Sequence, residues 1–120
     1  MRQIQETVLK SYPINIWLDD RRPMPPDFDV HVKTEQEAIK VLKDHIDDYI
    51  RISFDHDLGD PDVVGDGYGV AKWIEEQAYY GNIKPVKWTV HSDNPVGIQD
   101  IIRAMESSER FWNEREDHEM

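Results

Sequence analysis

The stretch that decides the fold is Arg51-Ile52-Ser53-Phe54-Asp55-His56-Asp57-Leu58-Gly59. A short apolar run stops abruptly at two aspartates on either side of a histidine, and a glycine follows. Short apolar runs bounded by turn residues are typical of a buried strand. We therefore predict that this strand delivers charged side chains to one edge of a sheet.

Two further stretches follow the same pattern. The run from Ile14 to Leu18 leads into the carboxylate pair Asp19-Asp20, and the run from Val86 to Val90 leads into His91-Ser92. If the three strands are parallel and adjacent, their polar ends gather in one place. In open α/β sheets, ligands bind in the crevice beyond the carboxyl ends of the strands. We expect the functional site to lie there.

The segments between these strands predict the remaining elements. Val30 to Val32 is typical of a short strand, and Thr34 with Glu37 forms a capping box that begins a helix. A second helix is expected from about Tyr68 to Tyr80, and a third begins at Asn94-Pro95. The order strand, loop, strand, helix, strand, helix, strand, helix predicts an α/β fold with a parallel sheet and helices on both faces.

Several segments have weaker or special signals. Between Asp20 and Val30 the chain is too short for a full helical crossover, so the first helix is lost or reduced to a turn. The turn-rich, acidic segment from Asp60 to Gly67 is expected to be a mobile loop. Residues Met1 to Tyr12 fit either a helix or an added edge strand. Phe111 and Trp112 are expected to end the last helix, and residues Glu114 to Met120 to fray.

Length and composition limit the possible functions. The 120 residues suit one domain, with a core over residues 14–105 and a C-terminal extension over 106–120. The net charge of -11 argues against a grip on duplex DNA, because the field would repel phosphate, although a metal or a few arginines would let a small phosphorylated ligand bind. The sequence has no cysteine, no signal-peptide core and no apolar run near the ~20 residues that span a bilayer. We expect a cytoplasmic protein without membrane contact.

The carboxylates at the strand ends are candidate metal ligands. Asp19, Asp20 and Asp55 each follow an apolar run, so they would repel one another unless a cation lies between them. Oxygen ligands favour Mg²⁺ or Mn²⁺, and Ca²⁺ is also compatible. The alternative is that aspartate is simply common in this chain, as the solvated pair Asp47-Asp48 illustrates.

Other polar residues near these ends are candidates for catalysis and substrate binding. His56 or His91 would protonate a leaving group, although either would equally serve as a structural hydrogen-bonding residue. Arg21 would hold a phosphate, or else offset a nearby aspartate, with Arg22 exposed to solvent. Ser92 and Asn94, at a helix start, would cradle an anion or simply cap the helix.

Four motifs in this order resemble a known family. They are Trp17-Leu18-Asp19-Asp20-Arg21-Arg22-Pro23, Phe54-Asp55-His56-Asp57-Leu58-Gly59-Asp60, Gly67-Tyr68 and Thr89-Val90-His91-Ser92-Asp93-Asn94-Pro95. The pattern resembles the cyclic-phosphate processing receiver domain, a divergent branch of the response-regulator receiver fold, over roughly Ile14 to Met105. The resemblance implies a flavodoxin-like three-layer sandwich with a mostly parallel four-stranded sheet in the order 2-1-3-4.

The resemblance also implies roles for individual residues. Asp19 and Asp20 match the acidic pair that binds Mg²⁺ in receivers, and Asp55 matches the aspartate that accepts a phosphoryl group. Asp57 falls where the family places a main-chain oxygen on the metal. Ser92, or less closely His91, matches the hydroxyl residue after the fourth strand.

The chain also departs from ordinary receivers. Ordinary receivers have a lysine after a fifth strand, and this chain offers neither that strand nor that lysine. The similar dipeptide Lys84-Pro85 comes before a strand and not after one. Signalling by phosphorylation is therefore not expected. The hypothesis is a metal-dependent phosphoesterase acting on a cyclic phosphate, either the 2′,3′-cyclic end of RNA or a cyclic nucleotide. The alternative is a catalytically inactive receiver that binds a protein partner.

Overall fold

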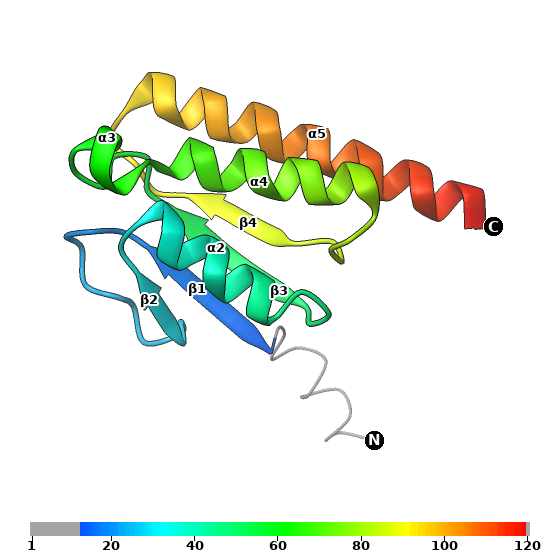
Figure 1. The fold of residues 1–120 in the computed structure, drawn as a ribbon, viewed down its shortest axis with the longest axis horizontal. Coiled ribbons are helices and arrows are strands. Elements are labelled where there is room, and N and C mark those ends of the chain that lie inside the picture. The colour runs from blue at the N-terminus through cyan, green and yellow to red at the C-terminus, as the bar shows by residue number, and fades with distance from the viewer. Residues whose placement is uncertain (1–12, 120) are drawn as a thin grey trace.

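A four-stranded parallel sheet forms the centre of the molecule. The computed structural model describes residues 13–119, and the side chains of residues 13–116. The strands are β1 (Ile14–Leu18), β2 (Val30–Val32), β3 (Ile50–Phe54) and β4 (Lys87–Val90), in the order β2-β1-β3-β4. Figure 1 shows all four arrows pointing the same way. The predicted strand order is confirmed, and residues 13–119 contain no fifth strand.

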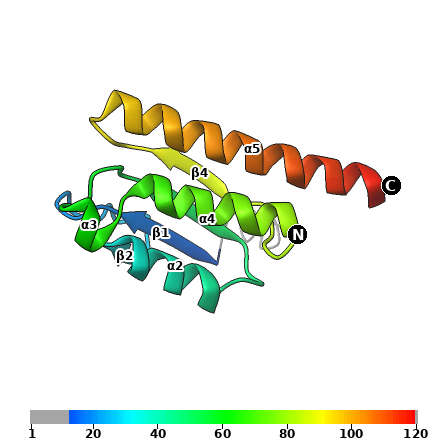
Figure 2. The same ribbon diagram turned by 45° about the horizontal axis from the view of Figure 1, so that its top comes forward.

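Within residues 13–119, three long helices and one short helix connect and follow the strands. They are α2 (Glu35–Asp44), α3 (Pro61–Val64), α4 (Gly67–Tyr80) and α5 (Pro95–Glu119). Thr34 caps α2 as predicted, since its hydroxyl oxygen accepts a hydrogen bond from the Glu37 backbone N–H at 3.0 Å. Helix α4 packs against both α2 and α5, so the long helices lie side by side on one face of the sheet (Figures 1 and 2).

The two faces of the sheet differ in chemistry because side chains alternate along each strand. Ile16, Leu18 and Phe54 are fully buried under the helices with Ile74. On the opposite face the strands carry Asn15, Trp17, Arg51, Ser53, Lys87 and Thr89. The contiguous hydrophobic core cluster therefore lies on the helical side, while Trp17 is buried on the opposite face.

A loop between β1 and β2 covers part of the second face, and the predicted loss of a helix between Asp20 and Val30 is confirmed. The Phe28 ring packs edge-on against Trp17 at 5.2 Å, and the Arg51 guanidinium lies 4.0 Å from the centre of the Phe28 ring. Helices on both faces were expected, but within residues 13–119 the three long helices all lie on one face. The physical reason is the short connection between β1 and β2, which covers the sheet without a helical crossover.

Two element boundaries also differ from the prediction. The segment from Asp60 to Gly67, expected to be a loop, contains α3, whose first turn Asp60 caps through the Asp62 backbone N–H. Helix α5 continues to Glu119 instead of fraying from Glu114. The Trp112 indole N–H donates to the Ile83 carbonyl, and the Arg115 guanidinium donates to the last carbonyls of α4. These contacts hold the second half of α5 against the domain.

Two expectations concern the chain beyond the core. The choice between helix and strand for Met1 to Tyr12 lies outside the described residues. Within the described part of the chain, none of the helices combines the length and the apolar character needed to cross a membrane.

Candidate functional site

The parallel ladder brings the predicted strand-end residues side by side. Just beyond the strands, the Asp19 backbone N–H donates to the Val32 carbonyl at 3.1 Å, and the Asp55 N–H donates to the Leu18 carbonyl at 2.9 Å. The His91 N–H donates to the Phe54 carbonyl at 2.8 Å. These bonds continue the sheet by one residue on each strand. Side chains far apart in the sequence therefore meet at its carboxyl edge.

An acidic cluster of Asp19, Asp20 and Asp55 lies at this edge. One carboxylate oxygen of each residue lies within 4.8 Å of the others. Asp19 is 0% and Asp55 3% exposed, so water screens their charges poorly. The Oδ1 atom of Asp20 is buried and accepts no hydrogen bond from the described residues. Buried polar atoms are nearly always satisfied, so this oxygen requires a partner that the described residues do not supply.

Asp19 is the anchored member of the acidic cluster. Its Oδ1 accepts from the backbone N–H groups of Arg21 and Arg22 at 2.7 and 2.8 Å, which folds the loop after β1 into a turn. Its Oδ2 accepts from the Arg22 guanidinium at 2.9 Å and pairs with His91 Nε2 at 3.0 Å. Burial alone would raise the pKa of Asp19, but these four hydrogen bonds outweigh it and the pKa is lowered. Asp19 therefore remains ionised.

Asp55 is the less stabilised member. Burial raises the pKa of Asp55, and repulsion from the ionised Asp19 raises it further. The Arg22 guanidinium, the His56 backbone N–H and the Ser92 hydroxyl lower the pKa only in part. The charged form of Asp55 is thus stabilised incompletely by the protein alone. An added cation would favour it.

Arg22, and not Arg21, is the arginine of the acidic cluster. Its guanidinium lies 2.9 Å from Asp19, 3.5 Å from Asp55 and 2.7 Å from the exposed Asp93. We expected Arg22 to be exposed to solvent and Arg21 to face the site. The Arg21 side chain is exposed, and its charge acts on Asp57. Sequence alone does not separate two adjacent arginines, because the turn at Asp19 decides which side chain points inward.

Both ring nitrogens of His91 are engaged. Nδ1 lies 2.7 Å from the Ser53 hydroxyl, which in turn accepts from Thr89, and Nε2 lies 3.0 Å from Asp19. The ring stacks on Trp17 with 3.9 Å between ring centres and 3° between planes. Burial lowers the pKa of His91, although the Asp19 carboxylate partly opposes this. The neutral ring therefore donates its Nε2–H to Asp19 and holds that carboxylate in place.

His56 has a different environment. Its Nδ1 lies 2.8 Å from Asp57 Oδ1, while its Nε2 lies 3.7 Å from Asp66 Oδ2, beyond hydrogen-bond distance. Asn94 donates to Asp57 at 3.2 Å and caps α5 by accepting from the Gly97 N–H. Hydrogen bonding from His56, more than any other contact, lowers the pKa of Asp57. The Asp57 carboxylate points to His56 and Asn94, not into the acidic cluster.

Comparison with known proteins places this geometry in a family. The family model of the cyclic-phosphate processing receiver domain matches residues 14–107, most of the chain. The chain belongs to this family. Neither the curated proteins nor the solved structures contain a match. The resemblance seen in the sequence motifs is confirmed, and so is the receiver-like flavodoxin fold.

The site residues of this receiver domain fall into two groups. Asp19, Asp20, Asp55, His91 and Arg22 form the acidic cluster and its supports. His56, Asp57 and Asn94 form a second group, joined by hydrogen bonds and linked to the first through the His56 backbone N–H on Asp55. Ser92 connects the two groups, because its hydroxyl contacts Asp55 and accepts from the Asn94 N–H.

Proposed function

We propose that this receiver domain hydrolyses a cyclic phosphate ester with the help of a divalent cation, Mg²⁺ or Mn²⁺. The observation that carries the proposal is the acidic cluster, in which a buried oxygen of Asp20 lacks a partner among the described residues. Oxygen ligands on opposite sides of Mg²⁺ lie about 4 Å apart, which agrees with the spacing of these carboxylates. The donor set therefore fits a hard cation.

Asp20 and Asp55 would supply the main ligands. Both oxygens of Asp19 already accept two hydrogen bonds each, so Asp19 would contribute mainly through its charge or by releasing Arg22. A cation held there would draw electron density from a phosphoryl oxygen of the substrate. The same cation would relieve the repulsion that raises the pKa of Asp55.

The other residues would act on the substrate directly. Hydrolysis adds water across one ester P–O bond of the ring and leaves a phosphomonoester and a free hydroxyl. The departing oxygen needs a proton, and His56 is better placed to give it than His91 because its Nε2 has no hydrogen-bond partner among the described residues. Asp57 would orient the His56 ring. Arg22 or the exposed Arg21 would hold the phosphate through paired hydrogen bonds.

The substrate class rests on the family description together with the site. We propose the 2′,3′-cyclic end of RNA or a cyclic nucleotide, since both are cyclic phosphodiesters in which hydrolysis breaks one of the two ring ester bonds. A small anionic group can approach this acidic protein only where local cations reverse the sign of the field. The proposed cation and Arg22 would provide that reversal.

A hydrolysis assay tests the proposal. 2′,3′-cyclic and 3′,5′-cyclic nucleotides are incubated with the protein and Mg²⁺, Mn²⁺ or a chelator. We expect cation-dependent release of a phosphomonoester, reduced by at least about 100-fold in Asp55→Asn and in His56→Asn. Asp47→Asn, an exposed aspartate at the opposite end of the sheet, is the matched control and should keep full activity.

One result would overturn the proposal. If the folded protein hydrolyses neither class of nucleotide with either cation, it is not a phosphoesterase for these substrates. A rise in melting temperature with Mg²⁺ but no turnover would instead favour an inactive receiver that binds a protein partner.

A further inference from the structure

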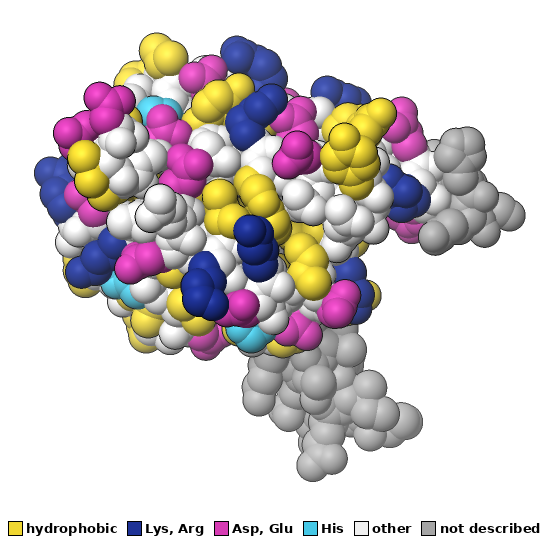
Figure 3. Space-filling model, in the orientation of Figure 1, with side chains coloured by type: hydrophobic (Ala, Val, Ile, Leu, Met, Phe, Trp, Pro, Cys, Tyr) yellow, Lys and Arg dark blue, Asp and Glu magenta, His cyan; other side chains and the backbone are white. Residues whose placement is uncertain are grey.

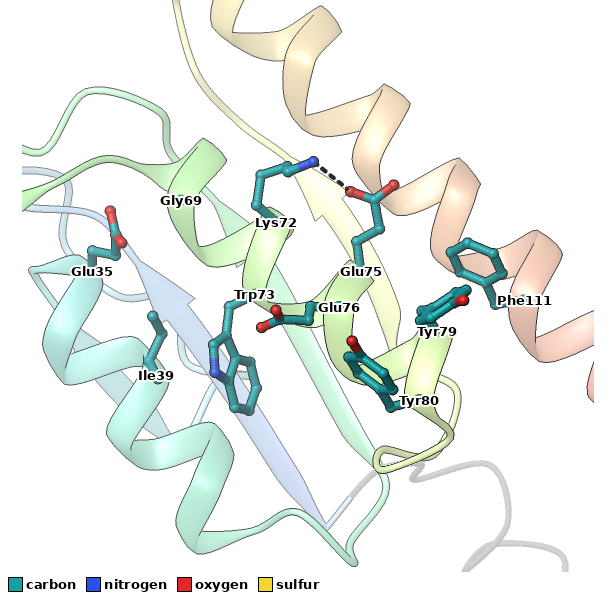
Figure 4. Close-up of a pocket in the computed structure, with 10 residues that line it drawn as sticks. All are labelled: Glu35, Ile39, Gly69, Lys72, Trp73, Glu75, Glu76, Tyr79, Tyr80 and Phe111. Carbon is teal, nitrogen blue, oxygen red and sulfur yellow. Dashed lines mark ion pairs between the residues drawn. The ribbon is translucent and has the colours of Figure 1, made fainter.

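A groove on the helical face is lined by residues to which the catalytic proposal gives no role. It encloses about 500 Å³ and is lined by outward-facing residues of α2, α4 and the second half of α5 (Figure 4). Its lining is Glu35, Ile39, Gly69, Lys72, Trp73, Glu75, Glu76, Tyr79, Tyr80 and Phe111. Four aromatic rings and three glutamates therefore share one groove with a single lysine.

The aromatic side of the groove is exposed and pre-arranged. Tyr79 and Tyr80 are 58% and 64% exposed, although large apolar rings are usually covered in a monomer. Tyr79 packs edge-on against Tyr80 at 5.0 Å and against Phe111 at 5.3 Å, so the rings are held in place before any partner arrives. Tyrosine and tryptophan are the residues most often decisive for binding at interfaces.

The charge of the groove selects the kind of partner. Lys72 is paired with Glu75 at 3.1 Å, which leaves Glu35 and Glu76 to set the sign of the groove. Figure 4 shows the Glu76 carboxylate between the rings of Trp73 and Tyr80. Glu76 has no ion pair among the described residues. A carboxylate between aromatic rings favours a cation, through direct attraction and through the negative faces of the rings.

We propose that this groove binds a basic segment of another protein, with an arginine or lysine side chain placed at Glu76 between Trp73 and Tyr80. Apolar side chains of the same segment would cover Tyr79 and Phe111. A second copy of this chain fits less well, because two molecules with a net charge of -11 repel each other. Figure 3 shows hydrophobic side chains gathered on this face, with both acidic and basic side chains around them.

Binding of a labelled peptide tests the proposal. The probe is a fluorescein-labelled peptide of arginine and leucine, and its control has each arginine replaced by the neutral isostere citrulline. We expect the arginine peptide to bind more tightly, with an affinity that falls as salt rises. Glu76→Gln and Tyr80→Ala should each weaken binding about fivefold. Glu106→Gln removes the same charge from an exposed site on α5 outside the groove and should bind as the wild type.

Several results would overturn the proposal. Equal binding of the two peptides, or equal effects of Glu76→Gln and Glu106→Gln, would mean that no specific cation site exists. A dimer seen by sedimentation that disappears in Tyr80→Ala would identify a second copy as the occupant. Asp55→Asn should leave peptide binding unchanged, so failure of the phosphoesterase proposal would not affect this test.

Discussion

Substituting Gly67 by alanine should disturb the site and the fold together. Gly67 begins α4, and its N–H donates to the His56 carbonyl at 2.9 Å. A Cβ atom at this position would overlap the Asp55 carbonyl oxygen and approach the His56 Cα at 3.2 Å. These neighbours are backbone atoms, so no side-chain rotation can relieve the overlap. The start of α4 must move away from the end of β3.

The size of the effect follows from the steric overlap and from one hydrogen bond. Forcing an extra methyl group into a packed position costs roughly 1–3 kcal/mol. Breaking the Gly67 hydrogen bond would add about 1 kcal/mol, while the better helix propensity of alanine returns at most about 1 kcal/mol. We expect Gly67→Ala to lower the free energy of unfolding by about 2 kcal/mol.

Gly69→Ala is the matched comparison, because it adds the same methyl group two residues later in the same helix. Its Cβ would overlap only the Glu35 carboxylate, at the end of a flexible side chain that can move aside. This breaks the hydrogen bond from the Asp66 N–H to Glu35 but improves helix propensity, so the net change should stay within about 1 kcal/mol.

Urea unfolding of the two variants measures this difference. A loss of about 2 kcal/mol should lower the midpoint by about 1 M. Equal midpoints for Gly67→Ala and Gly69→Ala would refute the close backbone approach of α4 to Asp55. If hydrolytic activity is found, Gly67→Ala should also reduce it more than Gly69→Ala does.

Three further changes probe the acidic cluster. Asp20→Asn should raise the melting temperature in chelator, because one half-buried negative charge is removed from beside Asp19 and Asp55, and should abolish any stabilisation by Mg²⁺. Arg22→Ala should lower the melting temperature in chelator more than Arg21→Ala, and Mg²⁺ should restore part of the loss. Burial lowers the pKa of His91 below the ordinary histidine value of 6.5. As the pH falls below 6.5, the unfolded chain therefore binds a proton at His91 before the folded chain does. The stability that the neutral ring contributes above pH 6.5 is lost as the pH falls toward the lowered pKa. His91→Gln should therefore flatten the fall in unfolding free energy below pH 6.5, measured by urea unfolding in chelator.

The sequence predicts most of the sheet and the place where the strand-end side chains meet. Each apolar run is followed directly by its polar residues, and parallel pairing then brings Asp19, Asp55 and His91 together. Their meeting needs only the strand order and the one-residue extension of the ladder. The pattern of strand ends is therefore enough to bring these three residues to one edge.

The orientation of individual side chains could not be predicted in the same way. Arg21 and Arg22 are adjacent and chemically identical, and each of the two histidines lies within two residues of a strand end. Their roles separate only through tertiary contacts: the turn at Asp19 points Arg22 inward, and stacking on Trp17 encloses His91. The length of α5 depends likewise on where Trp112 meets Ile83.

The absence of a helical crossover between β1 and β2 also explains why polar side chains can support the acidic cluster from the second face. A helix on the second face would require apolar side chains there, whereas the short loop leaves room for polar ones. Ser53, Thr89 and His91 form a hydrogen-bonded chain on this face that ends at Asp19. Each of these side chains satisfies the hydrogen-bonding group of the next, so the hydrogen-bonded series can be half-buried at little cost in free energy. Its last hydrogen bond, from His91, helps to keep Asp19 ionised. The same shortening of the chain that removes a helix thus supplies the hydrogen bonds that hold the acidic cluster.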